Sequence, residues 1–262
     1  MQQDHTKINE IAWNQLAYEA WNNRFGTPFE AAAKIKNDPA KKLGAIYKYF
    51  GNVKNKKIVN LLGSHGSKAV ALALLGADVT VVDFSWDNQR YACELAKEAH
   101  TNIKYIVSDV LHIPASEKIC DFDVAFCELG ILHYFTDLKA FFQIVSSMLK
   151  KNGIFVIQDF HPVSTKLITS KGKRHKVTGD YFSSSIEETE VAYLKFIPGI
   201  DSLTEDEKSG FQKALIRRWT IGEIITSLAD SGFLIKELEE SEGPKPEDKG
   251  IPKIFTICSS KI

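Results

Sequence analysis

Short apolar runs alternate with segments of helical spacing through the middle of the chain. The apolar runs cover residues 58–62, 78–83, 103–107, 122–127 and 154–157, and β-branched residues are frequent in them. Between them, residues 68–75, 89–99 and 137–150 place apolar side chains three or four positions apart. Strands of this kind, each followed by a helix, predict a parallel sheet with both faces covered.

The C-terminal part continues the pattern with a helix and two more strands. A helix is expected at about 221–231, with Thr220 as its N-cap. Strands are expected at 232–238 and 253–259, separated by the polar stretch 239–252. The predicted fold class is therefore α/β, with a doubly wound sheet of seven strands between two layers of helices.

The first 52 residues lie outside this pattern and form a helical appendage. Aromatic and aliphatic residues recur at helical spacing over 4–25, and shorter helices are expected at 29–37 and 40–50. Trp13 and Trp21 are eight positions apart, so both can face the same pocket mouth. The appendage either packs on the sheet or forms a lid over a ligand.

The remaining 53–262 form the core, interrupted by a predicted insertion at 160–217. The insertion follows the fifth strand, so it lies at the carboxyl edge of the sheet, where functional loops gather. It contains a basic stretch with Arg174, then Tyr181, and ends in Arg217 and Arg218. One interpretation is a solvated loop. The other is a substrate cap in which Arg174, or Arg217 with Arg218, holds an anionic substrate.

A glycine turn and an acid identify the binding edge. The strand 58–62 ends at Gly63, a short turn leads into a helix, and the next strand ends at Asp83. This unit is typical of sites for nucleoside-containing ligands. Glycine lets the ligand approach the backbone, and the carboxylate accepts hydrogen bonds from ribose hydroxyls.

The glycine spacing discriminates between two ligand classes. A dinucleotide turn requires G-x-G-x-x-G. Counted from Gly63, the second and third glycine positions hold His65 and Lys68. This disfavours a nicotinamide-dependent oxidoreductase.

Residues Val59 to Ser67, V-N-L-L-G-S-H-G-S, resemble the first motif of the class I S-adenosylmethionine-dependent methyltransferases, V-L-D-L-G-C-G-T-G. The chain departs from it at Leu61, which replaces an acid, and at His65 and Ser67, which replace glycines. Residues 108–110, 128–135 and 149–157 are similar to later motifs of the family. The resemblance covers 58–160 and 218–260.

The resemblance implies a Rossmann-like sheet with an antiparallel last strand, N-terminal helices over the ligand and a cap at 160–217. It implies S-adenosylmethionine as cofactor and S-adenosylhomocysteine as product. The resemblance assigns the methionine end of the cofactor to Gly63, Ser64, His65 and Gly66 of the turn, and the ribose to Asp83 and Phe84 at the end of the second strand. It assigns the adenine to Ser108, Asp109 and Val110 after the third strand, and the sulfonium to Glu128 and Leu129 after the fourth. Trp13, Trp21, Arg174, Tyr181 and Arg218 are predicted to bind the substrate.

Methyl transfer from a sulfonium is an in-line displacement, so the protein mainly aligns the reactants and excludes water. A general base is needed only for an acceptor that arrives protonated. His133 is best placed for this, with an unperturbed pKa of ~6.5, and Tyr134 and His161 are the reserves. No metal is expected, because the histidines do not show ligand spacing.

Composition and charge indicate which classes of partner to expect. The 262 residues contain 33 basic and 33 acidic side chains, so no overall field favours nucleic acid or an anionic membrane. No apolar run approaches 20 residues. Four dispersed cysteines without a C-x-x-C pair suggest a reduced, cytoplasmic protein. A small-molecule acceptor and a monomer or homodimer are expected. The alternative is a cofactor-binding regulatory or partner protein without catalysis.

Overall fold

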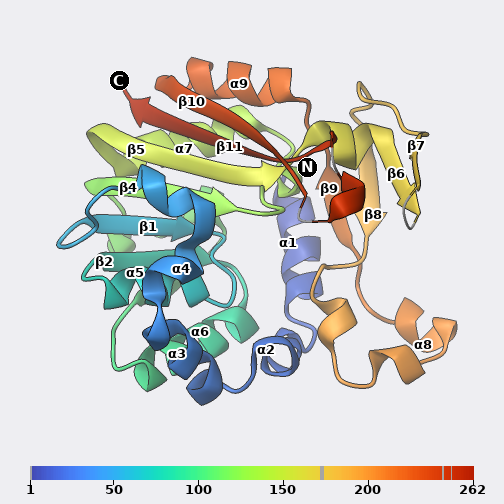
Figure 1. The fold of residues 1–262 in the computed structure, drawn as a ribbon, viewed down its shortest axis with the longest axis horizontal. Coiled ribbons are helices and arrows are strands. Elements are labelled where there is room, and N and C mark those ends of the chain that lie inside the picture. Colours follow the sequence, from blue (N-terminus) through green and yellow to red (C-terminus); the bar gives the residue numbers. More distant parts are fainter. Residues whose placement is uncertain (1, 172–173, 244, 249) are drawn as a thin grey trace.

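The computed structural model describes residues 2–171, 174–243, 245–248 and 250–262. A seven-stranded sheet runs through its centre in the order β10-β11-β5-β4-β1-β2-β3 (Figure 1). Strand β11 is antiparallel to both of its neighbours, while β5, β4, β1, β2 and β3 are mutually parallel. The predicted fold class and strand count are confirmed. The strands are β1 (Lys57–Leu61), β2 (Asp78–Asp83), β3 (Lys104–Val107), β4 (Phe122–Glu128), β5 (Leu149–Phe160), β10 (Phe233–Glu242) and β11 (Pro252–Lys261).

Alternation along the strands divides the interior into two apolar clusters, one on each face. In β1, Ile58 belongs to the cluster beneath α5 (Ser67–Leu74) and α6 (Trp86–Glu98). Its neighbour Val59 belongs to the cluster beneath α7 (Leu138–Met148) and α9 (Ile221–Asp230). Helix α7 begins at Asp137, whose carboxylate accepts from Lys139 N and Ala140 N. The parallel strands are therefore apolar on both faces, as the continuous runs predicted.

The N-terminal segment forms α1 (Gln2–Trp13), α2 (Ala17–Phe25), α3 (Pro28–Asn37), α4 (Pro39–Leu43) and a 3₁₀ turn (Gly44–Tyr49). The single helix expected over 4–25 is broken, because Leu16 has a φ of 64°. The break turns α2 onto α6, where Trp21 Nε1 donates to Asn88 Oδ1 at 2.8 Å and Ala17 N donates to Asp87 Oδ2 at 3.0 Å.

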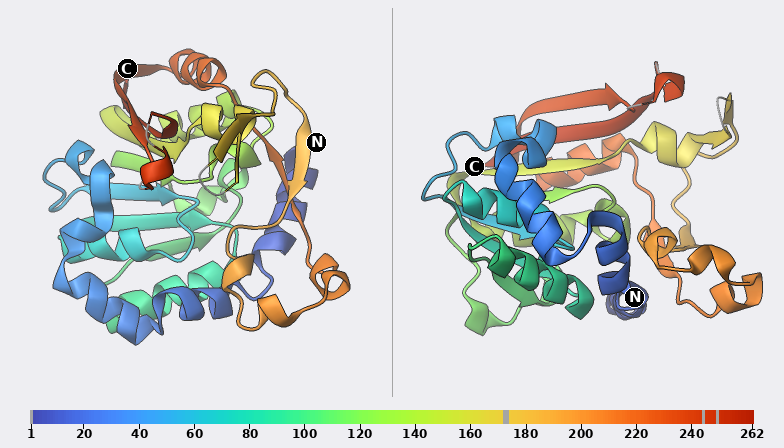
Figure 2. Two further views of the ribbon diagram at one scale, coloured as in Figure 1. Left: turned by 45° about the vertical axis from the view of Figure 1, so that its right-hand side comes forward. Right: turned by 60° about the horizontal axis from the view of Figure 1, so that its bottom comes forward.

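The segment 160–217 projects beyond the carboxyl edge of the sheet (Figures 1 and 2). It contains two small antiparallel pairs, β6 (Ile168–Lys171) with β7 (Arg174–Val177) and β8 (Ile186–Thr189) with β9 (Ala214–Arg217), and the short helix α8 (Glu205–Ser209). Helix α1 joins this segment to the core: Asn9 exchanges two hydrogen bonds with the backbone of Leu215. Among the described residues, no helix has the length and apolarity to cross a bilayer.

Candidate active site

A cavity of about 320 Å³ lies at the carboxyl ends of β1, β2 and β4. The core contributes the glycine turn, Asp83, Phe84 and residues 128–131 to its walls. The N-terminal helices form a second wall, to which they contribute Trp13, Trp21, Arg24, Phe25 and Lys42. The 160–217 segment contributes one residue, Ala192. The two tryptophans thus line one cavity, as their spacing indicated.

The glycine turn is held in an unusual backbone conformation. Leu62, Ser64 and Gly66 have φ angles of 49°, 48° and 71°. A Cβ at Gly63 would lie 2.6 Å from Asn60 Oδ1, and one at Gly66 would lie 2.6 Å from the Ala92 Cβ. Both clashes are with other residues of the protein, so packing requires glycine at these two positions whether or not a ligand is bound. The sequence had indicated only the ligand as the reason for glycine.

Asp83 connects the turn to the end of β2. Its Oδ2 accepts from Ser64 N at 3.0 Å, and its Oδ1 accepts from Ser85 N at 2.9 Å and from Asn88 Nδ2 at 3.2 Å. Burial raises the pKa of Asp83, and these hydrogen bonds oppose that shift. A carboxylate has about four lone-pair sites, so Asp83 can still accept from a ligand in the cavity.

His65 is packed among aromatic rings beneath the appendage. Its ring centroid lies 4.5 Å from that of Phe25 and 5.0 Å from that of Trp21, and its Nδ1 lies 2.9 Å from Ser67 Oγ. Burial, with the charges of Lys42 and Arg24, lowers the pKa of His65 to about 3. The imidazole is therefore neutral at pH 7 and shapes the wall of the cavity.

This gives a pH-dependent prediction for the protein without ligand. A histidine whose folded pKa lies below its unfolded value of ~6.5 costs ~1.4 kcal/mol of stability per pH unit as the pH falls between those values. We expect His65→Phe to reduce this acid-side loss between pH 6.5 and 5. Urea denaturation at pH 7.5, 6 and 5 measures it, and parallel stability curves for the two proteins would contradict the prediction.

Glu128, at the end of β4, forms an ion pair with Lys68 in the first turn of α5. The two side chains are 18% and 19% exposed and both line the cavity. Burial raises the pKa of Glu128, whereas the charge of Lys68 lowers it. The cavity therefore presents one negative and one positive group side by side.

The loop after β4 is held from below by Asp159 of β5. This buried carboxylate accepts from Gly130 N at 2.6 Å, from Phe160 N at 2.7 Å, and from Ile131 N and Leu132 N at 3.1 Å each. Leu129 and Gly130 have positive φ angles of 56° and 89°. The carboxylate thus stabilises a strained turn whose residues 129–131 line the cavity.

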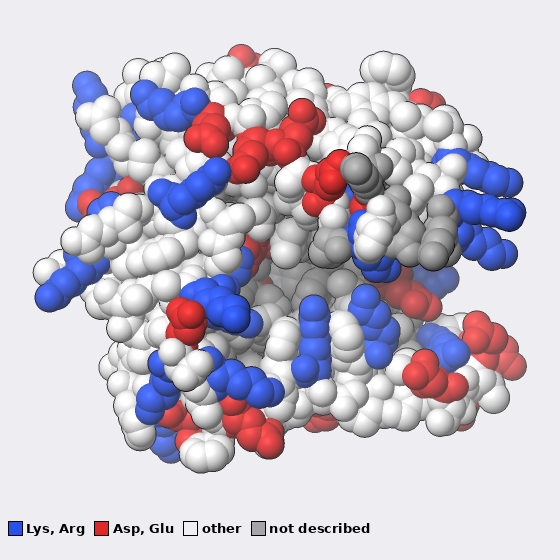
Figure 3. Space-filling model, viewed as in Figure 1, with Lys and Arg blue, Asp and Glu red and all other residues white. Residues whose placement is uncertain are grey.

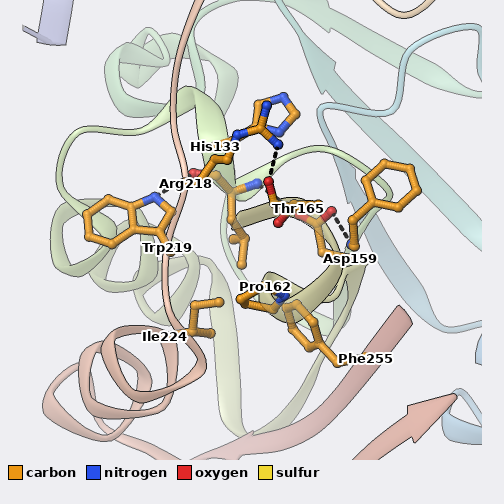
Figure 4. Close-up of a pocket in the computed structure, with 10 residues that line it drawn as sticks. His133, Asp159, Pro162, Thr165, Arg218, Trp219, Ile224 and Phe255 are labelled. Carbon is orange, nitrogen blue, oxygen red and sulfur yellow. Dashed lines mark hydrogen bonds between the residues drawn. The ribbon is translucent and has the colours of Figure 1, made fainter. Parts of the chain in front are cut away.

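Two of the predicted acid–base residues, His133 and Tyr134, are neighbours on this loop, but their side chains line different cavities. The Tyr134 side chain lines the cavity, and its hydroxyl accepts from Trp13 Nε1 at 2.9 Å. His133 instead lines a smaller cavity of about 40 Å³ with Asp159, Thr165, Arg218 and Trp219 (Figure 4). Burial lowers the pKa of His133 to about 4, so the imidazole is neutral at pH 7.

The third predicted base, His161, has both ring nitrogens engaged within the protein. Its Nδ1 accepts from Val163 N at 3.1 Å, and its Nε2 lies 2.6 Å from Glu240 Oε1. The ring is 3% exposed and lines neither cavity. These contacts suit a structural role in joining β5 to β10 and do not suit a base.

The predicted adenine residues border a separate small cavity of about 20 Å³. Ser108, Asp109 and Val110 line it together with Asp83 and Phe84 of the core and Gln2, Thr6 and Asn9 of α1. The Asp109 carboxylate already accepts from Leu111 N at 3.0 Å and lies 2.8 Å from His112 Nδ1. Helix α1 covers this end of the predicted cofactor site.

The predicted substrate residues of the 160–217 segment do not meet at the large cavity. Arg174 is exposed on β7, and Tyr181 accepts from Ile221 N at 3.2 Å. Arg218 pairs with Glu187 at 3.1 Å and donates to Thr165 O at 2.9 Å, and the second contact is one of those dashed in Figure 4. Arg217 pairs with Glu223 at 2.7 Å. The anion role proposed for these arginines is therefore not supported by their positions.

Sequence reasoning missed four side chains. Lys68 and Asp159 were detectable in principle, because each adjoins a motif at the carboxyl edge. Arg24 and Lys42 carried no signal, since only the folding of the appendage brings them to the cavity. Among the residues that the structure describes, no three His, Cys, Asp or Glu side chains gather as a metal site.

Comparison with known proteins agrees with this geometry. A family model described as a methyltransferase domain matches residues 53–207, more than half of the chain. The chain therefore belongs to this methyltransferase family, and the predicted class is confirmed. No curated protein sequence matches it.

Two solved structures illustrate the likeness. One is an S-adenosylmethionine-dependent methyltransferase from Mesorhizobium loti, 22% identical over 86% of this chain and 99% of that one, with a TM-score of 0.64. The other is magnesium protoporphyrin IX methyltransferase from Synechocystis PCC 6803 with bound S-adenosylhomocysteine, 15% identical over 99% of this chain and 100% of that one, with a TM-score of 0.60. At such identities the likeness is one of fold.

Proposed function

We propose that this protein transfers the methyl group of S-adenosylmethionine to a small-molecule acceptor. The observation that carries the proposal is the cavity at the carboxyl edge, where the glycine turn, Asp83 and the Glu128–Lys68 pair lie together. The residues fit the cofactor chemically. Asp83 offers acceptors to ribose hydroxyls, and Glu128 and Lys68 offer opposite charges to an amino-acid end with an ammonium and a carboxylate. The small-molecule acceptor is supported by a concave cavity of about 320 Å³ with aromatic walls.

When bound, the cofactor supplies an electrophilic methyl group on a positively charged sulfur. The chain's own contribution is to align the reactants and exclude water. Trp13, Trp21 and Phe25 cover the cavity with apolar surface, and Tyr134 projects a hydroxyl into it. Helices α1 and α2 act as a lid in this proposal, which requires them to open for exchange.

Proton removal is assigned to His133, with Tyr134 as the group that faces the cavity directly. The assignment depends on the neutral state of His133 and on its place in the loop whose residues 129–131 line the cavity. His161 is left with a structural role by its two internal contacts.

The activity is tested by incubating the protein with methyl-labelled cofactor and a pool of cell metabolites. Label transferred to a small molecule supports the enzyme. Binding of S-adenosylhomocysteine without any transfer would instead favour the non-catalytic cofactor-binding protein.

His133→Ala tests the base. We expect turnover to fall roughly 100-fold, within the range for loss of a general base, while the dissociation constant for S-adenosylhomocysteine changes less than about threefold, because the side chain does not line the cofactor cavity. His175→Ala, at a half-buried position of β7 that lines neither cavity, is the control. Unchanged turnover at saturating acceptor would remove His133 from the chemistry.

A further inference from the structure

Two cations, Arg24 of α2 and Lys42 of α4, stand at the border of the proposed cofactor cavity. Both also line an adjoining open space of about 470 Å³, so the two cavities share this boundary. Figure 3 shows Lys and Arg side chains around a hollow near the middle of the molecule. In the described part of the chain, neither the Arg24 guanidinium nor the Lys42 ammonium pairs with a carboxylate.

Aromatic rings hold these cations in place instead of counter-ions. The Arg24 guanidinium carbon lies 4.3 Å from the ring centroid of Phe196 and 4.8 Å from that of Phe25. The Lys42 nitrogen lies 5.2 Å from the Phe25 centroid. Contact with a ring face positions a cation while leaving its N–H groups available to a ligand.

The local charge balance is positive. Glu128 is already matched by Lys68, which leaves Arg24 and Lys42 in excess on the cavity wall. Burial lowers the pKa of Lys42, as do the charges of Lys68 and Arg24, while the charge of Glu128 opposes the shift. Lys42 is half-buried and Arg24 is exposed, and an anion bound between them would offset the repulsion that lowers the pKa of Lys42.

The adjoining space extends the same chemistry outward. Lys34 and Lys41 line it, with Asp38 as its acid. The Asp38 carboxylate accepts from Lys41 N at 2.9 Å as the cap of α4, and Lys34 Nζ donates to Phe25 O at 3.0 Å. A ligand that enters here meets mainly positive side chains before it reaches the cavity.

We propose that Arg24 and Lys42 form an anion subsite that binds a carboxylate or phosphate group of the methyl acceptor. The acceptor class is thus an anionic small molecule, with its charged group between α2 and α4 and its reacting atom in the 320 Å³ cavity. The inference rests on the proposed function, since it assigns the Glu128–Lys68 pair to the cofactor and the remaining cations to the acceptor.

The test uses the full chain saturated with S-adenosylhomocysteine and titrates it with inorganic phosphate, and separately with malonate, at constant ionic strength. Tryptophan fluorescence reports binding, because Trp21 lines the same cavity. We expect saturable binding of at least one anion to the wild type. Arg24→Gln/Lys42→Gln should weaken it at least tenfold, since two charged contacts are lost. Which anion binds more tightly separates a phosphate from a carboxylate acceptor.

Lys36→Gln/Lys54→Gln is the matched control, because it removes two exposed lysines that line neither cavity. It should change anion affinity less than twofold. The affinity of the Arg24→Gln/Lys42→Gln protein for S-adenosylhomocysteine should stay within about threefold of the wild type.

Several outcomes would overturn the assignment. If the affinity of the Arg24→Gln/Lys42→Gln protein for S-adenosylhomocysteine falls tenfold or more, the two cations hold the cofactor's own carboxylate. If the wild type binds S-adenosylhomocysteine but neither anion, the subsite fails while the methyltransferase proposal stands. If the wild type does not bind S-adenosylhomocysteine, the proposed function itself fails.

Discussion

Replacing Asp159 with alanine is expected to lower the free energy of unfolding by about 3–5 kcal/mol, because several buried N–H donors lose their acceptor together. The carboxylate is 6% exposed and accepts four backbone hydrogen bonds, three of them from the strained loop 130–132. Urea denaturation with linear extrapolation measures the loss.

Asp159→Asn keeps the shape of the side chain and one acceptor oxygen, so this variant can be measured in place of Asp159→Ala if the alanine protein does not fold. We expect a loss of about 1–3 kcal/mol and weaker binding of S-adenosylhomocysteine, since residues 129–131 line the cavity. Asp230→Ala is the control: its side chain is 54% exposed and pairs with Lys139 at 3.4 Å, so a change within about 0.5 kcal/mol is expected. Equal stabilities for the Asp159 and Asp230 variants would mean that other contacts hold the loop.

Removing the Asp83 carboxylate is expected to have the second large effect, on cofactor binding. Asp83→Ala loses charge-assisted hydrogen bonds worth ~1.5–3 kcal/mol, which corresponds to roughly tenfold to a hundredfold weaker binding. The structure adds a second contribution, because the same carboxylate accepts from Ser64 N and so orders the glycine turn. Calorimetric titration with S-adenosylhomocysteine measures the change.

Asp78 offers a matched control for this experiment. It begins the same strand at the opposite end and is exposed, so Asp78→Ala removes an equal charge far from the cavity. Its affinity for S-adenosylhomocysteine should match that of the wild type. If Asp83→Ala binds as tightly as Asp78→Ala, Asp83 does not contact the cofactor.

Local pattern was sufficient for the sheet and its binding edge. Continuous apolar runs such as 58–62 mark strands buried on both faces, and the glycine turn before α5 marks where the first strand meets its helix. Both signals are encoded within a few neighbouring residues. The fold class was predictable for that reason, and the family was predictable from the resemblance of Val59 to Ser67 and of the later segments to known motifs.

The positions of single side chains along the long insertions were not encoded locally. Arg218 and Glu187 are distant in sequence and adjacent in space, so the pairing that removes Arg218 from the proposed anion role was invisible. The same holds for His161, whose partner Glu240 comes from β10. A titratable residue near a motif is only a candidate until its partners are known.

The sequence by itself determined an α/β core, the glycine turn and the acid at the end of β2, because these depend on short-range periodicity and turn chemistry, and its motifs resembled those of the methyltransferases. Tertiary structure alone decided that residues of α1 and α2 line the cavity, that Asp159 holds the loop after β4, and that Arg24 and Lys42 stand without a carboxylate partner among the described residues. The physical reason is that burial and charge pairing depend on contacts between segments far apart in the chain, which no local pattern records.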